Sequence, residues 1–208
     1  MRLYLVRHGE TGWNKLKKVQ GHSDIPLNEY GRYLAVQTAN GLKNVVFDAA
    51  YTSPLSRARE TAKIILSDRE VPVYEEPRIQ EMGFGVCEGM CCRGENRDPG
   101  SDEFNKFFTD TAGYQVPEGG ESIAEVKERV QEFLEELYKR KDLQDKTILI
   151  STHGAALTAM LNCMKGEEDI SKFWGNGVPK NCSVTIVEVK DGMPEIVEEG
   201  KIFYSCGQ

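Results

Sequence analysis

The 208-residue sequence lacks several features that would assign it to a specialised class of protein. It has no apolar run of the length that crosses a membrane, no apolar signal segment after Met1, no internal repeat and no low-complexity stretch. It also lacks an excess of positive charge: its formal net charge is −7, whereas general binders of nucleic acid or anionic membranes need a basic surface. We therefore expect a cytoplasmic protein that binds neither nucleic acid nor membranes.

Cysteine and histidine are present without the spacing of a disulfide framework or a metal site. The six cysteines follow no regular pattern, and a chain of this length needs no disulfides to hold its core, so we expect reduced thiols. Cys87, Cys91 and Cys92 do not form a Cys-x-x-Cys pair, no partner pair follows them, and the three histidines are scattered. The sequence therefore predicts no metal site and no cofactor.

Short apolar strands alternate with amphipathic helices along the chain. Strands are predicted at 3–6, 47–52, 71–74, 147–151, 182–189 and 195–204, and helices at 28–42, from 53 onward, from 122 onward and at 154–164. The helix at 28–42 has Tyr30, Leu34, Thr38 and Leu42 at helical spacing. The alternation predicts an α/β fold, a three-layer α/β/α sandwich with a mostly parallel central sheet, formed by a single domain over residues 1–208.

The stretch 76–120 departs from this alternation. Its periodicity is weak and it is rich in glycine, proline and charged residues. Loops of this length are usually functional, so we expect a lid insertion over the carboxyl ends of the strands, with a short helix near 103–109. Ser122 and Glu125 then form a capping box that begins a long amphipathic helix.

His8 lies where the first predicted strand ends. Residues 3–6 are apolar without alternation, which is typical of a strand buried on both faces of a parallel sheet. Because ligands bind outside the carboxyl ends of strands in open α/β sheets, Arg7 and His8 are expected at the binding crevice. Gly9 permits a close or left-handed turn there.

Two further strand ends carry side chains of the same kind. The apolar run 148–150 leads to His153 and a glycine, as the first strand leads to His8 and a glycine. The segment 52–62 leads from a strand into a helix for which Ser53 is the predicted N-cap and Pro54 the first residue. Arg57 is expected in the first turn of that helix, where the free N–H groups and the planar guanidinium favour a phosphate.

Three segments together resemble the histidine phosphatase (phosphoglycerate-mutase-like) superfamily. They are LVRHGET at 5–11 followed by Trp13-Asn14, TSPLSRARETA at 52–62, and ILISTHG at 148–154, in the family's order and across nearly the whole chain. The resemblance implies a metal-independent enzyme in which His8 attacks phosphorus to form a phosphohistidine. It implies that Arg7, Arg57 and His153 supply positive charge around the phosphate and that Asn14 adds a neutral donor.

The resemblance also points to a general acid. The family carries a glutamate after the third strand, and IQEMGFG at 79–85 matches there, which makes Glu81 the candidate for protonating the leaving alkoxide. Family members often continue with Gly-x-Trp-Glu-Gly, where this chain has GVCEG at 85–89. With Cys87 at the place of that bulky aromatic, we expect either another side chain in the gap or a wider pocket. PEGGES at 117–122 also matches the family, and Glu121 is left unassigned.

The resemblance leaves the reaction open. A phosphatase lets water hydrolyse the phosphohistidine, whereas a 2,3-bisphosphoglycerate-dependent phosphoglycerate mutase returns the phosphoryl group to a second hydroxyl. The segment around Glu81 lacks the neighbouring basic residues that mutases carry, and the chain is short for their basic insertion. A phosphomonoester hydrolase acting on a small phosphorylated metabolite is therefore expected. A mutase is the alternative, and a non-catalytic module that binds a phosphorylated ligand is a second one.

Three lysines, Lys15, Lys17 and Lys18, follow Asn14 closely. A solvated run of charges is the first interpretation, and attraction of a phosphorylated or acidic substrate toward the site is the alternative. Neither the physiological substrate nor the oligomeric state follows from the sequence.

Overall fold

The computed structural model describes residues 1–205, and its centre is a six-stranded sheet of order β3-β2-β4-β1-β5-β6. The strands are β1 (Arg2–Arg7), β2 (Ala49–Thr52), β3 (Val73–Glu75), β4 (Thr147–Thr152), β5 (Val184–Lys190) and β6 (Met193–Lys201). The first four strands pair in parallel, while β5 and β6 extend the sheet as an antiparallel hairpin beside β1. The predicted mostly parallel sheet is confirmed.

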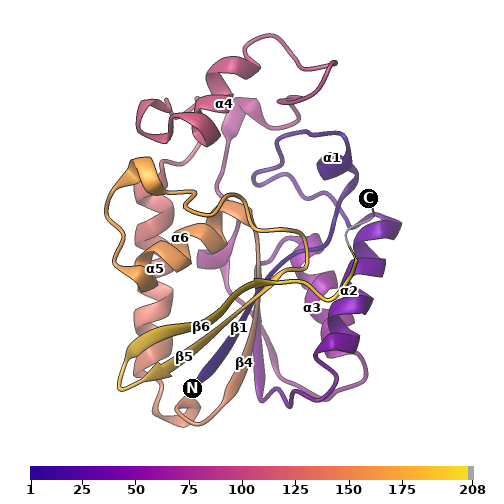
Figure 1. Cartoon of the computed structure of the whole chain (residues 1–208), viewed down its shortest axis with the longest axis vertical. Helices are drawn as coiled ribbons and strands as arrows, with labels where there is room; N and C mark the ends of the chain where they lie inside the picture. The colour runs from indigo at the N-terminus through magenta and orange to yellow at the C-terminus, as the bar shows by residue number, and fades with distance from the viewer. Residues whose placement is uncertain (206–208) are drawn as a thin grey trace.

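Helices cover both faces of this sheet (Figure 1). On one face lie α2 (Glu29–Gly41) and α3 (Ser56–Leu66), and on the other lie α5 (Ile123–Lys139) and α6 (Gly154–Lys165). Strand β1 is buried on both faces: Leu3 and Leu5 belong to the apolar cluster that includes α5 and α6, and Tyr4 and Val6 to the cluster that includes α3. The run of apolar residues without alternation therefore predicted the burial correctly, and the three-layer α/β/α arrangement is confirmed.

Helix α2 begins and ends close to its predicted bounds, but its buried face differs. The side chain of Asn28 accepts a hydrogen bond from the Gly31 N–H and caps the helix. Leu34 and Thr38 are buried as expected, whereas Tyr30 is 46% exposed and does not belong to the buried face. Helical spacing alone counted Tyr30 because its ring is apolar, but in the structure this ring stacks on the exposed Tyr33 ring, with centroids 5.9 Å apart.

The predicted start of α3 is wrong. The helix begins at Ser56 rather than at Pro54, and Leu55, which has no capping side chain, occupies the N-cap position. The Ser56 N–H instead donates to Oδ1 of Asp24 at 2.7 Å, so a carboxylate from the preceding loop satisfies this helix end. Because that partner is distant in the sequence, a local capping pattern did not reveal it.

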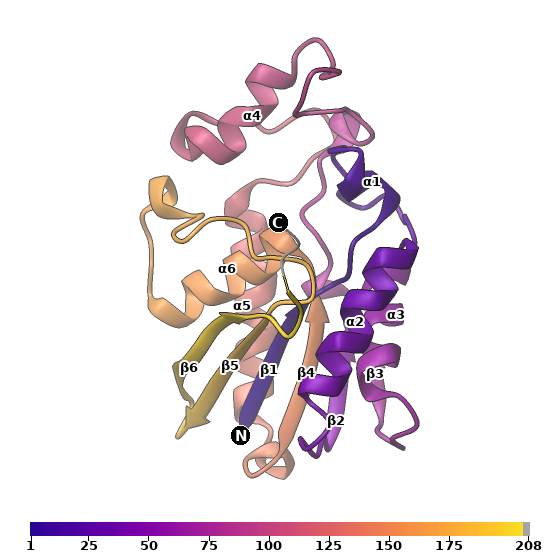
Figure 2. The same cartoon turned by 45° about the vertical axis from the view of Figure 1, so that its right-hand side comes forward.

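Residues 76–120 lie beyond the carboxyl ends of the strands, as predicted (Figures 1 and 2). This segment contains α4 (Ser101–Thr109), close to the helix expected at 103–109, and the short 3₁₀ helices η1 (Pro77–Ile79), η2 (Gly85–Cys87) and η3 (Thr111–Gly113). The remaining short elements are α1 (Gly12–Lys15), η4 (Lys141–Leu143) and η5 (Ile170–Lys172). Backbone bonds between Val19 and Gly89 and Met90, at 2.8 and 2.9 Å, join the segment to the loop that follows α1.

Cys87 is half-buried and packs against the same apolar cluster as Tyr114. The Tyr114 ring lies 4.9 Å from the Phe107 ring, and burial raises the pKa of its hydroxyl. At the position where the family often has tryptophan, Cys87 therefore packs against an apolar cluster that includes Phe84, Phe104 and Phe107. The five described cysteines are free thiols, and Cys206 lies outside the described residues.

Among residues 1–205, none of the helices combines the length and the apolar character that a membrane crossing needs. The cytoplasmic location stays a prediction.

Candidate active site

The predicted site residues converge at the carboxyl edge of the sheet. A cavity of about 110 Å³ is lined there by Arg7, His8, Asn14, Arg57 and Glu81. Arg7 and His8 come from the end of β1, while Asn14 lies in α1, Arg57 in the first turn of α3 and Glu81 in the loop after η1, so the fold brings together distant parts of the chain. His153 does not line this cavity but lies behind it, with its ring 5.1 Å from the His8 ring between centroids.

His8 is 2% exposed, and its contacts hold the ring in one neutral tautomer. Its Nδ1 lies 2.6 Å from the Gly9 carbonyl oxygen, so Nδ1 carries the proton and donates, and Nε2 keeps its lone pair. Burial, with Arg57 and Arg7 nearby, lowers the pKa of His8 well below its usual value, which keeps the ring uncharged. Gly9 is needed because a Cβ there would lie 2.5 Å from the Gly31 carbonyl oxygen.

Arg57 is fully buried beside His8. Its Nε donates to Nδ1 of His153 at 3.2 Å, and its Nη atoms donate to the carbonyl oxygens of Ser23 and Gly21, both at 2.7 Å. A guanidinium has five N–H groups, so two remain for an anion in the cavity. Burial lowers the pKa of Arg57 to about 10, which leaves it charged at neutral pH.

His153 differs from the expectation that it supplies positive charge. Its Nε2 donates to the Ser53 hydroxyl at 2.7 Å while its Nδ1 accepts from Arg57, so protein partners occupy both ring nitrogens. Burial, together with Arg57 and His8, lowers the pKa of His153 well below its usual value. In this structure it is therefore a neutral side chain that orients Arg57. Ser53, predicted as a helix cap, holds His153 in that tautomer.

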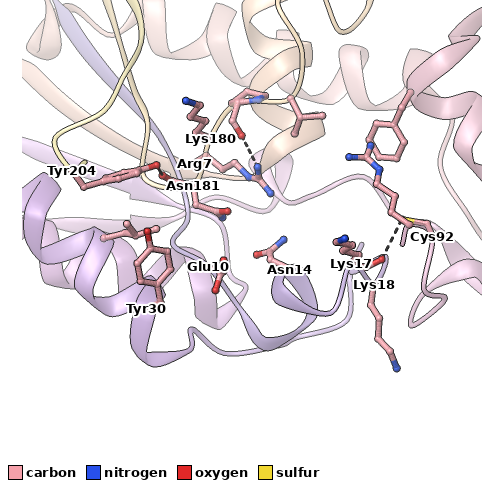
Figure 3. Close-up of a pocket in the computed structure, with 15 residues that line it drawn as sticks. Arg7, Glu10, Asn14, Lys17, Lys18, Tyr30, Cys92, Lys180, Asn181 and Tyr204 are labelled. Carbon is pink, nitrogen blue, oxygen red and sulfur yellow. Dashed lines mark hydrogen bonds between the residues drawn. The ribbon is translucent and has the colours of Figure 1, made fainter. Parts of the chain in front are cut away.

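Arg7 and Asn14 supply donors where this cavity meets an adjoining pocket that they also line, which Figure 3 shows. One Arg7 Nη donates to the Pro179 carbonyl oxygen, while its buried Nε has no partner within residues 1–205. Asn14 uses its Oδ1 to accept from the Thr11 N–H at 3.1 Å, so its Nδ2 end is the donor side. In Figure 3 the Arg7 guanidinium and the Asn14 amide point toward one another, and two facing donors define a place for an anion.

Glu81 caps a helix as well as lining the cavity. Its Oε2 accepts from the Gly154 N–H at 2.9 Å, and its Oε1 accepts from the N–H groups of Ala155 and Ala156, both at 3.1 Å. These donors are the free N–H groups at the start of α6. The carboxyl group of Glu81 is therefore fixed at the N-terminus of α6, in a residue that also lines the cavity.

A family profile described as histidine phosphatase superfamily (branch 1) matches residues 3–201. The chain belongs to the histidine phosphatase superfamily. Among its relatives, phosphoserine phosphatase 1 of Hydrogenobacter thermophilus is 33% identical over 92% of this chain and 88% of that protein. A probable phosphoglycerate mutase of Serratia proteamaculans is 34% identical over 80% of this chain and 75% of that protein.

A similar solved structure is that of a mutant phosphoserine phosphatase from Entamoeba histolytica in complex with phosphoserine. It is 31% identical, with a TM-score of 0.78 over 95% of each chain. This chain therefore has both the sequence and the fold of a histidine phosphatase, and the predicted family is confirmed.

Sequence reasoning missed the residues of this histidine phosphatase that hold Glu81 in place. Arg129 donates to the backbone carbonyl oxygens of Arg78, Gln80 and Glu81 at 2.7 to 3.0 Å. Its remaining donors pair with the carboxylate of Glu121 at 2.9 and 3.0 Å. The PEGGES motif that contains Glu121 is visible in the sequence. Its partner Arg129 lies in the middle of α5 and belongs to no motif.

His22 completes this support. Its Nε2 lies 2.8 Å from the Glu81 carbonyl oxygen and 3.3 Å from a Glu121 carboxylate oxygen. Burial alone would raise the pKa of Glu121, but hydrogen bonds from His22, Arg129 and the Gly83 N–H outweigh it and hold the pKa at about 2. Glu121 is therefore an ionised anchor beside the cavity rather than a group that lines it.

Proposed function

We propose that this chain is a phosphomonoester hydrolase that acts on a small phosphorylated metabolite through a phosphohistidine on His8. The observation that carries the proposal is the neutral His8, with Nδ1 committed to a carbonyl oxygen and Nε2 free beside two arginines. A neutral imidazole in this arrangement is a nucleophile that needs no further activation. The family and the named relatives support a phosphatase of small metabolites.

In the proposed first step, Nε2 of His8 attacks phosphorus and the bond from phosphorus to the ester oxygen breaks. Charge spread over the phosphoryl oxygens is stabilised by N–H groups of Arg7 and Arg57 and by Asn14. His153 keeps Arg57 oriented through its Nδ1. Glu81, which enters this step as the carboxylic acid, delivers its proton to the leaving oxygen, so an alcohol rather than an alkoxide departs.

In the proposed second step, water attacks the phosphohistidine and the bond from phosphorus to Nε2 breaks. Glu81, now deprotonated, takes a proton from that water, and inorganic phosphate leaves. Residues 76–120 act as the lid over this reaction, because they lie across the carboxyl edge of the sheet and supply Phe84, Phe104 and Phe107 to the cavity wall. No step needs a metal or a cofactor.

Trapping of the intermediate tests the nucleophile. Brief reaction with a ³²P-labelled phosphomonoester, followed by denaturation, should leave acid-labile label on the wild-type protein and none on His8→Ala. A protein that only binds phosphorylated ligands would leave no label on either. Label that persists on His8→Ala would contradict the assignment of His8.

Leaving-group dependence tests Glu81. Glu81→Gln should slow the hydrolysis of an alkyl phosphate far more than that of p-nitrophenyl phosphate, whose leaving group hardly needs a proton. Glu125→Gln is the matched control, because Glu125 also accepts backbone N–H bonds at a helix start but belongs to α5 and does not line the cavity. Equal losses of rate on the two esters would contradict the assignment of Glu81 as the general acid.

A mutase is the second candidate, favoured by the relative named probable phosphoglycerate mutase. The two reactions separate in one assay on 3-phosphoglycerate, with and without 2,3-bisphosphoglycerate, in which free phosphate and 2-phosphoglycerate are followed together. Free phosphate without the isomer supports the hydrolase. Formation of 2-phosphoglycerate that depends on the bisphosphate would contradict the hydrolase proposal and support a mutase.

A further inference from the structure

The loop at residues 20–24 holds the buried guanidinium of Arg57, although it consists only of a turn and irregular backbone. The carbonyl oxygens of Gly21 and Ser23 in this loop accept hydrogen bonds from the two Nη atoms of Arg57, both at 2.7 Å. The position of the guanidinium beside the cavity therefore depends on what fixes the loop.

Glu88 fixes the loop through its backbone N–H groups. Oε1 of Glu88 accepts from the His22 N–H at 2.9 Å, and Oε2 accepts from the N–H and the hydroxyl of Ser23 at 2.8 and 2.6 Å. Oε1 also accepts from the Phe84 N–H at 3.1 Å, so each carboxylate oxygen has two donors. Glu88 belongs to residues 76–120 and does not itself line the active-site cavity.

One peptide group of the loop lies between Glu88 and Arg57. The carbonyl oxygen of the peptide group between Gly21 and His22 accepts from Arg57, and its N–H donates to Glu88. A trans peptide group is planar, and its C=O and N–H point in opposite directions. The two side chains therefore bond to opposite edges of one rigid unit. Hydrogen bonds linked in this way polarise one another, so each strengthens the other.

The contacts of Glu88 require an ionised carboxylate. Burial alone would raise the pKa of Glu88, but its four hydrogen bonds outweigh burial and lower the pKa. Since both oxygens face a backbone N–H, the NH₂ group of a glutamine would oppose a donor at either end. Gly21 permits the close approach, because its φ is +54° and a Cβ there would overlap Oε1 of Glu88.

We propose that Glu88 is a positioning residue, which fixes the loop at 20–24 and through it holds the Arg57 guanidinium in the geometry that binds the phosphoryl group. This inference rests on the proposed phosphatase function, in which Arg57 stabilises the transferred group. Because Glu88 belongs to residues 76–120, these residues then help to form the phosphate site as well as to cover it.

Glu88→Gln tests the proposal at nearly constant side-chain size. The variant should lower kcat/KM by about tenfold, the size expected for the loss of one hydrogen bond to a charged group. The loss should be the same on an alkyl phosphate and on p-nitrophenyl phosphate, because Arg57 binds the phosphoryl group that both esters share. A larger loss on the alkyl phosphate would mean that Glu88 acts on Glu81 through His22, and it would overturn the proposal.

The matched control for this variant is Glu125→Gln. Oε2 of Glu125 accepts from the N–H and the hydroxyl of Ser122, both at 2.7 Å, as Oε2 of Glu88 does from those of Ser23. Glu125 lies in α5 away from the cavity lining, so both rates should stay unchanged. Ser23→Ala is a milder variant that removes only the hydroxyl bond, and it should lower both rates by about threefold, whereas Ser122→Ala should not. Equal losses in the Glu88 and Glu125 variants would refute the proposal.

A double-mutant cycle tests whether Glu88 acts through Arg57. In an Arg57→Gln background, Glu88→Gln should cause almost no further loss of p-nitrophenyl phosphate hydrolysis, because the residue that it positions is absent. A merely structural contribution of Glu88 would instead add to the loss caused by Arg57→Gln, so additive losses would contradict the proposal. The rates are compared at a temperature at which urea denaturation shows each variant to be folded.

The outcomes also separate this inference from the proposed function. If no ester is hydrolysed, the phosphatase proposal fails, and calorimetric binding of inorganic phosphate decides the role of Glu88. Weaker binding by Glu88→Gln but not by Glu125→Gln would support it, and equal binding would refute it. If the wild type does not bind phosphate, the ¹⁵N NMR signal of the Arg57 Nε–H decides. A shift or loss of this signal in Glu88→Gln alone would support the role, and an unchanged signal would refute it.

Discussion

Replacing Arg129 by methionine should weaken both the fold and the proton transfer assigned to Glu81. Methionine keeps most of the unbranched stem, so the substitution removes chiefly the guanidinium. All five N–H groups of the Arg129 guanidinium donate hydrogen bonds, three to the backbone carbonyl oxygens of residues 78, 80 and 81 and two to the Glu121 carboxylate. The variant therefore leaves several acceptors without a donor at once.

The magnitude follows from burial. The Arg129 side chain is 18% exposed and Glu121 is 24% exposed, so water can replace only part of the lost bonding. With a net value of about 1 kcal/mol for a neutral hydrogen bond and more for a charged one, we expect a loss of about 3 kcal/mol in the free energy of unfolding. Arg97→Met is the control, because the Arg97–Asp102 pair is 51% and 78% exposed and should contribute less than about 1 kcal/mol.

Two measurements check this prediction. Urea denaturation gives the free energies of unfolding of the wild type, Arg129→Met and Arg97→Met. Initial rates on an alkyl phosphate and on p-nitrophenyl phosphate then show whether the position of Glu81 has changed, since only the first ester needs its proton. A loss of less than about 1 kcal/mol, or equal rate losses on the two esters, would refute the reasoning from these contacts.

Three further predictions follow from the same contacts. Acidification from about pH 7 to pH 5 should lower the free energy of unfolding, because burial lowers the pKa of His8 and His153 and the unfolded chain then binds protons that the folded chain does not. Denaturant titrations at several pH values measure this loss. His153→Gln should reduce the change in the free energy of unfolding per pH unit. Gly9→Ala should lower stability by about 1–3 kcal/mol, since its Cβ would meet the Gly31 backbone, while Gly12→Ala, with open space around it, should not; thermal unfolding compares them. Prolonged treatment with a chelator should leave the rate on p-nitrophenyl phosphate unchanged, and loss of activity restored by a metal ion would contradict the proposed mechanism.

The sheet and its two helix layers were predictable because their signals are local. An apolar run such as residues 3–6 specifies a strand buried on both faces, and the capping box of Ser122 and Glu125 begins α5 as predicted, with both of its hydrogen bonds present. The convergence of Arg7, His8 and Arg57 was likewise expected, because parallel strands present their carboxyl ends at one edge, whereas the choice of Glu81 came from the family resemblance. The structure places these four side chains around one cavity.

The errors concern side chains whose partners are distant in the sequence. Ser53 has the residue type and position of an N-cap, and its hydroxyl accepts from the Leu55 N–H at 3.3 Å, but its shorter bond, at 2.7 Å, is to His153, 100 residues away. Asp24 caps α3 in its place across a separation of 32 residues. Local sequence patterns predict only the hydrogen bonds that a residue can form with residues near it in the sequence. They contain no information about a partner that the fold brings close from a distant part of the chain.

The turn between β4 and α6 contacts both Arg57 and Glu81, the residues to which the proposed mechanism assigns phosphate binding and proton transfer. It presents His153 toward Arg57 on one side and the N–H groups of residues 154–156 toward Glu81 on the other. A shift of this turn would therefore move the group that orients the buried arginine and the donors that fix the carboxylate together. In the proposed mechanism, this strand-to-helix junction therefore influences the distance between the attacked phosphorus and the Glu81 carboxyl group. Substitutions at Gly154 or Ala155 should accordingly affect both steps of the reaction, even though neither residue takes part in the chemistry.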